Sequence, residues 1–321
     1  MMKMLFNNKA MFYLFTVIVF LGMMLLIVYT YQSFTMRQVQ EAVSSRLRTM
    51  DDFVDNFHND LDRSISISAT RAMISLEDYV SSNEEFFDSK SALDQSFKEI
   101  FVNGTINGNQ VVLMENSSFK NYSKKVMASA SAIGFYFNVT INDVSLDQSD
   151  PWNIDVHINA SVFLNDSQST AYWIYDKSFF TKVSIEGLRD PLYGIYTQGK
   201  FQNAIRRTNI SNFVVGQDTS GLLMHINNSY YYENSNAPSF LMRFYNDINA
   251  SSNGIETIIN IPVLFSQGFD IYPEKPVIDY QYYIDSYIAE LCNFQNMPNW
   301  FKIKDEELNK YNLSTLNYTS C

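Results

Sequence analysis

The stretch "NNKAMFYLFTVIVFLGMMLLIVYTYQSFTMRQ", residues 7–38, decides how the fold begins, because it carries no charge between Lys9 and Arg37. Its central part, residues 11–31, is almost entirely apolar. At about 1.5 Å of rise per residue, a helix of this length spans the roughly 30 Å hydrocarbon layer of a bilayer. The sequence therefore predicts a transmembrane helix over residues 11–31, preceded by a short cytoplasmic tail, residues 1–10.

A secretory signal that is removed after export is the alternative interpretation of this stretch. A cleavable signal has a shorter apolar region, about 7 to 15 residues, followed by small residues. Here the run ends in "VYTYQSF", with Tyr31 and Phe34 where small residues should stand. We therefore expect the helix to be retained as a signal anchor, with membrane lipid as its partner.

Glycosylation sequons indicate the orientation of this helix better than its weakly asymmetric flanking charges do. Asn-x-Ser/Thr sites are more frequent than composition gives by chance, and none precedes residue 103. N-glycosylation requires exposed Asn in a secreted context. We expect a single-pass protein of the cell membrane with its N-terminus in the cytoplasm and its bulk outside; a merely Asn-rich composition is the alternative. The candidate sites are Asn103, Asn116, Asn121, Asn138, Asn159, Asn165, Asn209, Asn227, Asn249, Asn312 and Asn317.

Charge and cysteine content agree with an exported domain. The net charge is −11, and the segment before Arg37 carries only two lysines, so the remainder is strongly acidic. An acidic surface repels nucleic acid, which we therefore exclude as a partner. The two cysteines, Cys292 and Cys321, both lie near the C-terminus. They are candidates for a disulfide that would fasten the C-terminal tail; two free buried thiols are the alternative.

The segment after residue 31 carries the strongest structural signal. There is no glycine between Gly22 and Gly104, and the first proline is Pro151, so the strongest helix breakers are missing. Apolar residues recur about every 3.7 positions, a helical period. The sequence predicts a long amphipathic helix over residues 32–82. Its apolar stripe is Val39, Val43, Leu47, Met50, Val54, Phe57, Leu61, Ile65, Ala69, Ala72, Leu76 and Val80.

An exposed apolar stripe of this length is unfavourable in water. Later segments of the chain, or other helices, must therefore cover it. The period exceeds the 3.5 residues of a heptad coiled coil, which disfavours a long left-handed dimer. The opposite face is predicted to be solvated; it carries Arg46, Asp51, Asp52, Asp55, Asn59 and Arg63.

Beyond the long helix, the pattern changes from helical to alternating. Residues 83–133 are predicted to hold two helical segments, 86–101 and 118–133. Three alternating runs follow, "FYFNVTINDVSL", "WNIDVHINASVFL" and "FFTKVSIEG". Turn residues separate these runs, which predicts an antiparallel meander with one solvated face. The fold class is therefore α+β.

The last part of the chain is less regular. The sequence assigns residues 134–321 to a β-rich exported domain, with a division near 190–215 as one option. "SGLLMHINNSYYYE" and "KPVIDYQYYID" resemble strands, "SNGIETIINIPVLFSQG" a short helix with a loop, and "DEELNKY" a terminal helical turn.

Catalytic and cofactor-binding signatures are missing from the sequence. It contains no G-x-S-x-G, no G-x-G-x-x-G after a strand, no P-loop, no H-E-x-x-H and no C-x-x-C. His58 on the long helix and His157 and His225 on expected strands are ordinary surface or packed residues. We expect no enzyme activity, no cofactor and no metal; a weak calcium site in "NDVSLDQSD" does not match a twelve-residue loop.

Several runs resemble a group of uncharacterised archaeal membrane-anchored envelope proteins, which are similar to pilin-like or secretion-associated components. The runs are "MDDFVDNFHNDLDRSISISATRAMISLEDYV", "VSIEGLRDPLYGI", "APSFLMRF", "GIETIIN" and "VIDYQYYI". The resemblance covers most of the chain and implies an N-terminal membrane helix, a long following helix and an exported β-rich domain. Its motifs are structural, so no functional residue follows from it.

A pilin-like protein would be processed before its apolar run. Archaeal prepilins are cut after a short charged leader that ends in Lys or Arg followed by Gly or Ala, and Lys9 and Ala10 stand at that place. Bacterial-type pilins carry a glutamate early in the helix, where this chain has Phe15. Cleavage after Ala10 would leave the membrane span intact.

The sequence favours a non-enzymatic envelope protein that presents a glycosylated domain for surface assembly, secretion or adhesion. Its predicted partners are other envelope proteins or further copies of itself. The alternatives are a membrane-anchored ligand- or carbohydrate-binding ectodomain and an anchored hydrolase. Tyr-rich and Asn-rich runs such as "YYYENSN" could bind sugars by stacking and hydrogen bonding.

Overall fold

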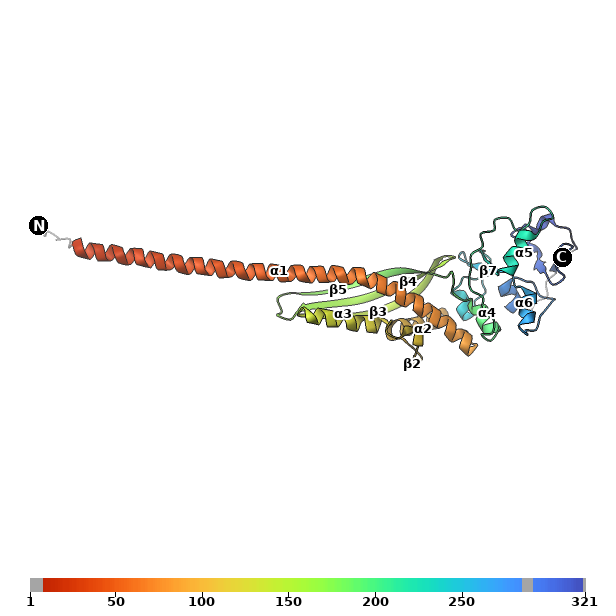
Figure 1. The fold of residues 1–321 in the computed structure, drawn as a ribbon, viewed down its shortest axis with the longest axis horizontal. Helices are drawn as coiled ribbons and strands as arrows, with labels where there is room; N and C mark the ends of the chain where they lie inside the picture. Colours follow the sequence, from red (N-terminus) through yellow and green to blue (C-terminus); the bar gives the residue numbers. More distant parts are fainter. Residues whose placement is uncertain (1–7, 285–290, 320–321) are drawn as a thin grey trace.

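A long N-terminal helix dominates the computed structural model, which describes residues 8–284 and 291–319 (Figure 1). Helix α1, Asn8–Asn83, contains 76 residues, which corresponds to a rod of roughly 110 Å. The prediction that the apolar helix continues into a long second helix over residues 32–82 is confirmed. The first part of α1 projects alone from a body that holds the rest of the described chain.

The apolar stripe of α1 is fully buried only from Met50 onward, and Val43 before it is half-buried. Val39 and Leu47 are exposed, whereas the later stripe residues pack into the main hydrophobic core. Val54 is half-buried. The buried members are Met50, Phe57, Leu61, Ile65, Ala69, Ala72, Leu76 and Val80.

Two further helices join α1 on one side of the body. Helix α2, Lys90–Asn103, begins at Ser89, whose side chain accepts a hydrogen bond from the Ala92 amide. Helix α3, Phe119–Ala132, begins in the same way at Ser118. A side chain that accepts from a free amide of the first turn stabilises a helix start by about 1 kcal/mol. Both helices match the two segments predicted from the sequence.

The predicted antiparallel meander is confirmed. Strands β3, Phe135–Asp150, β4, Asn153–Asp166, and β5, Tyr172–Ser184, form one sheet in the order β3-β4-β5. Val139 pairs with Val162, which pairs with Tyr175 on the next strand. Along β3 most outward residues are exposed, whereas along β4 only His157 and Asn159 are exposed and most other outward residues are half-buried. Helix α1 lies against β5, and α2 and α3 lie against β3, so the fold is a two-layer α+β arrangement.

Arg46 departs from the predicted solvated face of α1. Its guanidinium donates to the carboxylate of Asp166 at 2.8 Å and to the Gly134 carbonyl at 2.9 Å, and it lies 4.5 Å from the Phe135 ring centroid. Gly134 has φ +77°, and a Cβ there would lie 2.7 Å from the guanidinium. These contacts fix the point at which α1 leaves the body. The other predicted solvated residues, such as Asp51, are exposed.

Beyond Ser184 the described chain contains only short elements. The helices are α4, Pro191–Tyr196, α5, Ser220–Asn227, α6, Ile261–Ser266, and α7, Asp279–Ile284, with 3-10 turns η2, Met242–Tyr245, η3, Asp305–Glu307, and η4, Leu313–Thr315. The strands are β6, Tyr231–Glu233, β7, Ile255–Thr257, β8, Leu291–Phe294, β9, Lys302–Lys304, and β10, Tyr318–Thr319. Between α2 and α3 lie β1, Thr105–Ile106, β2, Asn109–Gln110, and η1, Val112–Met114.

Two sequence assignments in this part are wrong. "SGLLMHIN" forms helix α5, which buries Leu222 and Ile226 on one face, and the strand starts only at Tyr231. "PVIDYQYYI" is extended only at its start, where the Val277 amide donates to the Lys302 carbonyl. From Asp279 the chain is helical. The apolar residues of both runs are adjacent to one another or irregularly spaced, so their periodicity does not separate strand from helix.

Candidate functional site: the uncovered part of helix α1

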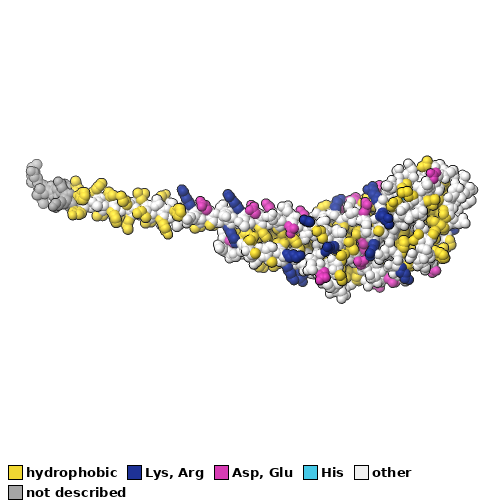
Figure 2. Space-filling view, viewed as in Figure 1, with side chains coloured by type: hydrophobic (Ala, Val, Ile, Leu, Met, Phe, Trp, Pro, Cys, Tyr) yellow, Lys and Arg dark blue, Asp and Glu magenta, His cyan; other side chains and the backbone are white. Residues whose placement is uncertain are grey.

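The part of α1 before Met50 carries a long series of exposed apolar side chains. Its most apolar 18-residue window is not buried at all. Among the described residues, α1 alone is long and apolar enough to cross a membrane. Figure 2 shows hydrophobic side chains along the isolated part of the helix, with charged ones gathering where the body begins. The single apolar N-terminal helix indicates a membrane anchor or signal anchor.

We call residues 32–49, which connect the apolar run to the body, the neck. It is about 27 Å long at the helical rise of about 1.5 Å per residue. Val39 is 61% exposed and Leu47 is 39% exposed. A helix of this length is marginally stable on its own, so the neck depends on the segments that continue it at both ends and on the contacts of Arg46 with the body.

A recess lies where the neck meets the body. Its volume is about 550 Å³, and it is open to solvent. Val43 and Arg46 contribute from α1, Ile133 and Gly134 from the end of α3, and Thr170 from the β4–β5 turn. The recess and the exposed stripe of the neck are therefore neighbouring features of one surface.

None of the eleven sequon asparagines is buried. Eight are exposed, and Asn121, Asn165 and Asn312 are half-buried. Asn138 and Asn159 lie on the exposed face of the sheet, as predicted from the alternation. The exposed ones are Asn103, Asn116, Asn138, Asn159, Asn209, Asn227, Asn249 and Asn317.

The predicted disulfide involves one described residue and one outside the described residues. Cys292 is buried in β8. Cys321 lies outside the described part of the chain. Strand β10 pairs antiparallel with β8, with Tyr318 opposite Phe294, so the backbone already holds the C-terminal segment beside Cys292.

The three histidines occupy different environments. His58 on α1 forms a hydrogen bond of 2.8 Å with the Tyr175 hydroxyl. His157 is exposed on β4. His225 is in helix α5 rather than in a strand; it is buried, and neither ring nitrogen has a hydrogen-bond partner among the described residues. Burial lowers the pKa of His225 to about 4. No group of His, Cys, Asp and Glu that could hold a metal occurs among the described residues.

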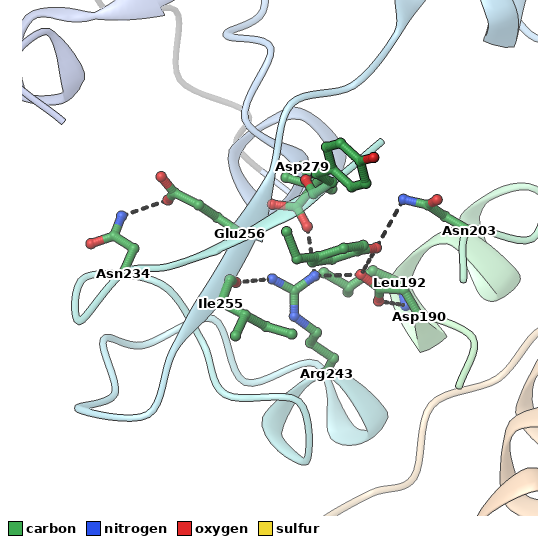
Figure 3. Close-up of polar contacts among 11 residues, drawn as sticks. Asp190, Leu192, Asn203, Asn234, Arg243, Ile255, Glu256 and Asp279 are labelled. Carbon is green, nitrogen blue, oxygen red and sulfur yellow. Dashed lines mark hydrogen bonds and ion pairs between the residues drawn. The ribbon is translucent and has the colours of Figure 1, made fainter. Parts of the chain in front are cut away.

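A buried ion network, which the sequence did not reveal, fastens the second half of the body (Figure 3). The Arg243 guanidinium in η2 donates at 2.6 Å both to Asp190, at the start of α4, and to Asp279, at the start of α7. It also donates to the Ile255 carbonyl of β7. The Tyr231 hydroxyl donates to Asp190 at 2.8 Å. Four segments distant in sequence are therefore held at one guanidinium.

The ion network is structural rather than reactive. Arg243, Asp190 and Asp279 are all fully or almost fully buried, so no substrate in solution reaches them. Burial raises the pKa of Asp279, and the positive charge of Arg243 opposes that rise. Removing one partner from a buried ion pair leaves an uncompensated charge, which costs about 3–5 kcal/mol.

Comparison with family models, with curated proteins and with solved structures found no match to this chain. The geometry of the chain itself, above all the exposed part of α1, is therefore the basis for a functional proposal.

Proposed function

We propose that the chain is a non-enzymatic, single-pass envelope protein that assembles with further copies of itself, or with other envelope proteins, through the neck. In this proposal residues 11–31 cross the membrane, residues 1–10 lie in the cytoplasm and the body is extracellular. The uncovered neck is the observation that supports it. A membrane-spanning helix needs about 20 residues, and α1 supplies 18 more, residues 32–49, before its first buried residue.

A helix of a neighbouring molecule would cover the exposed apolar residues of the neck. Val39 and Leu47 continue the stripe that the body buries from Met50 onward. The adjoining recess of about 550 Å³ gives room for side chains of a second helix. Packing apolar surface against a neighbour stabilises an assembly by about 25 cal/mol for each Å² removed from water. Assembly through an N-terminal helix would be similar to that of the pilin-like proteins that the sequence resembles.

Two sequons support an extracellular, glycosylated body. Asn165 pairs with Tyr136 on one side and Tyr172 on the other, and these rings are 57% and 67% exposed. Asn138 lies on the same exposed face of the sheet, where Ile174 is 67% exposed. Exposed apolar groups of this kind are unfavourable in water. Glycans on Asn138 and Asn165 would cover them.

Site-specific photocrosslinking in membranes of cells that produce the full chain tests the assembly. A photoreactive residue in place of Val39 or Leu47 should yield dimers and larger species. The same residue in place of Asp62, which is exposed on the covered part of α1, serves as the matched control and should yield monomer. Monomer alone at all three positions would contradict assembly through the neck.

Protease shaving of intact cells, followed by mass spectrometry of the released peptides, tests the orientation. Peptides from the body, with glycans on Asn138 and Asn165, should appear in the medium. Release of body peptides only after cell lysis would place the body inside the cell and contradict the extracellular proposal.

A further inference from the structure

A pocket lies in the body at the end of the molecule far from the N-terminus, where helices α4 and α6 are found (Figure 1). Its volume is about 490 Å³, which falls in the usual range of about 300–1,000 Å³ for small-molecule sites. Its walls come from the end of α4 and the turn after it, from the segment between α6 and α7, and from α7. If α1 is the membrane anchor, this pocket is presented away from the membrane.

Tyrosine rings form much of the pocket wall. The rings of Tyr196 and Tyr283 are stacked, with centroids 4.9 Å apart and planes 6° from parallel. Tyr272 packs against Tyr282 at 6.1 Å. Tyr196 is 37% exposed and Tyr272 is 45% exposed, so part of each ring remains accessible. Flat, rigid aromatic faces that end in a polar hydroxyl suit a ligand with one apolar and one polar side, and a sugar ring has both.

Two lysine ammonium groups lie at the same pocket. Lys275 is held in place, because its ammonium donates to the Tyr282 carbonyl at 3.0 Å and lies 5.1 Å from the Tyr272 ring centroid. The Lys200 ammonium lies 5.9 Å from the Phe269 ring centroid, and Lys200 is exposed. Cation–π contacts of this kind orient an ammonium without neutralising it.

The charge of the pocket is opposite to that of the chain. Asp270 is the one carboxylate among the described residues that line it, against the two lysines. The whole chain has a net charge of −11, whereas the side chains that line this pocket carry one net positive charge, which favours an anion there. The Gln198 side chain, also at the wall, can donate to and accept from hydroxyl groups.

We propose that this pocket binds an acidic sugar unit of a polysaccharide, such as a uronic acid. The exposed parts of the Tyr196 and Tyr272 rings contact the C–H face of the sugar. Lys200 and Lys275 pair with its carboxylate, and Gln198 bonds to hydroxyl groups. A neutral sugar would leave uncompensated the one net positive charge that two lysines and Asp270 give the pocket lining. The proposal names a ligand for the body and does not depend on assembly through the neck.

Isothermal titration calorimetry on the full chain in uncharged detergent micelles tests the proposal. The probes are trigalacturonate, the neutral trisaccharide maltotriose and inorganic sulfate. We expect trigalacturonate to bind with a Kd of about 0.1–1 mM, which is typical of a small solvent-exposed site. Maltotriose should bind at least tenfold more weakly. Binding of sulfate as tight as that of trigalacturonate would show a simple anion site and overturn the sugar proposal.

Three variants connect the binding to the pocket. Lys200→Met changes an exposed side chain and leaves the core intact, and it should weaken trigalacturonate binding at least fivefold. Adding Lys275→Met should abolish the binding. Lys124→Met, which removes an exposed lysine from α3, is the matched control and should bind like the unaltered protein.

Absence of trigalacturonate binding to the unaltered protein would refute the proposal. An unchanged Kd in Lys200→Met would also refute it, because that variant retains the fold. Crosslinking through the neck should be the same in all three variants, so loss of sugar binding and loss of assembly can be told apart.

Discussion

Replacing Glu77 by glutamine should change how the stability of the body depends on pH. Glu77 is 2% exposed on α1, and its carboxylate accepts a hydrogen bond of 3.0 Å from the Arg189 amide. Burial raises its pKa from an ordinary 4.5 to about 8. The hydrogen bond and charge of Arg189 lower this pKa, whereas the charges of Asp78 and Asp190 raise it further.

The sign of the effect follows from proton binding. Between pH 4.5 and about 8 the folded protein holds a proton on Glu77 that the unfolded chain has lost. The stabilising contribution of this carboxyl is therefore complete below pH 4.5 and is lost as the pH rises to about 8. Each pH unit in this window costs about 1.4 kcal/mol, so the loss from about pH 5 to about pH 8 is about 3–4 kcal/mol.

Glu77→Gln removes this titration and keeps an oxygen that can accept from the Arg189 amide. Its free energy of unfolding, relative to that of the unaltered protein, should therefore rise by about 3–4 kcal/mol from about pH 5 to about pH 8. Urea unfolding of the full chain in detergent, followed by tryptophan fluorescence, measures this difference. Glu85→Gln makes the same chemical change at an exposed position and should show no such trend. A difference between Glu77→Gln and the unaltered protein that stays constant with pH would refute the reasoning.

Three further substitutions in the body, and one control in the neck, are tested by the same unfolding assay. Phe57→Ala should lower the free energy of unfolding by about 3–5 kcal/mol, because Phe57 is buried with its ring centroid 4.8 Å from that of Phe137. Its control is Val39→Ala at an exposed position, which should change the free energy of unfolding by less than about 0.5 kcal/mol. Gly254→Ala should cost about 3 kcal/mol, because its Cβ would lie 2.1 Å from the Ala237 carbonyl oxygen, and an undiminished stability would contradict that close approach. Burial lowers the pKa of His225 from 6.5 to about 4, so the stability that its neutral form contributes is present above pH 6.5 and is lost as the pH falls toward 4. The free energy of unfolding of His225→Leu should therefore fall less than that of the unaltered protein between pH 6.5 and about 4. An equal fall in both proteins would count against a neutral buried imidazole.

The sequence predicted the elements whose pattern repeats over many residues. The stripe of α1 keeps one helical period from Val39 to Val80 without an intervening glycine or proline. The three meander strands alternate over 13 to 16 residues each. Long patterns of this kind average out local exceptions, so both the helix and the antiparallel sheet follow from the sequence.

Short apolar runs and long-range ion pairs could not be predicted in the same way. "LLMHI" in α5 is apolar at almost every position, so neither period stands out. Arg46 looks like its solvated neighbours on α1 in the sequence, and its contacts with Gly134, Phe135 and Asp166, 88 to 120 residues later, distinguish it. Arg243 meets two aspartates that are 53 and 36 residues away. One sequence does not show which distant charges meet.

Likewise, the candidate sites were only partly visible in the sequence. The exposure of Asn138 and Asn159 followed from the alternation of the strands, and the long apolar helix followed from the length of its run. The pocket near α4 depends on how Lys200 and Lys275 are brought together by helices of six residues each. Such short helices are positioned by tertiary contacts rather than by their own propensity.

Because α1 is one continuous helix, a tilt at its start displaces its far end. From the residue after Gly22 to its end at Asn83, α1 contains neither glycine nor proline, which are the residues at which helices often bend. Transmembrane helices tilt by about 20° on average. If the rod tilts as one piece, an inclination of about 20° carries the far end of α1, roughly 110 Å from its start, sideways by about 40 Å. The thickness of the lipid layer would then help to decide which direction the outermost surface of this protein faces.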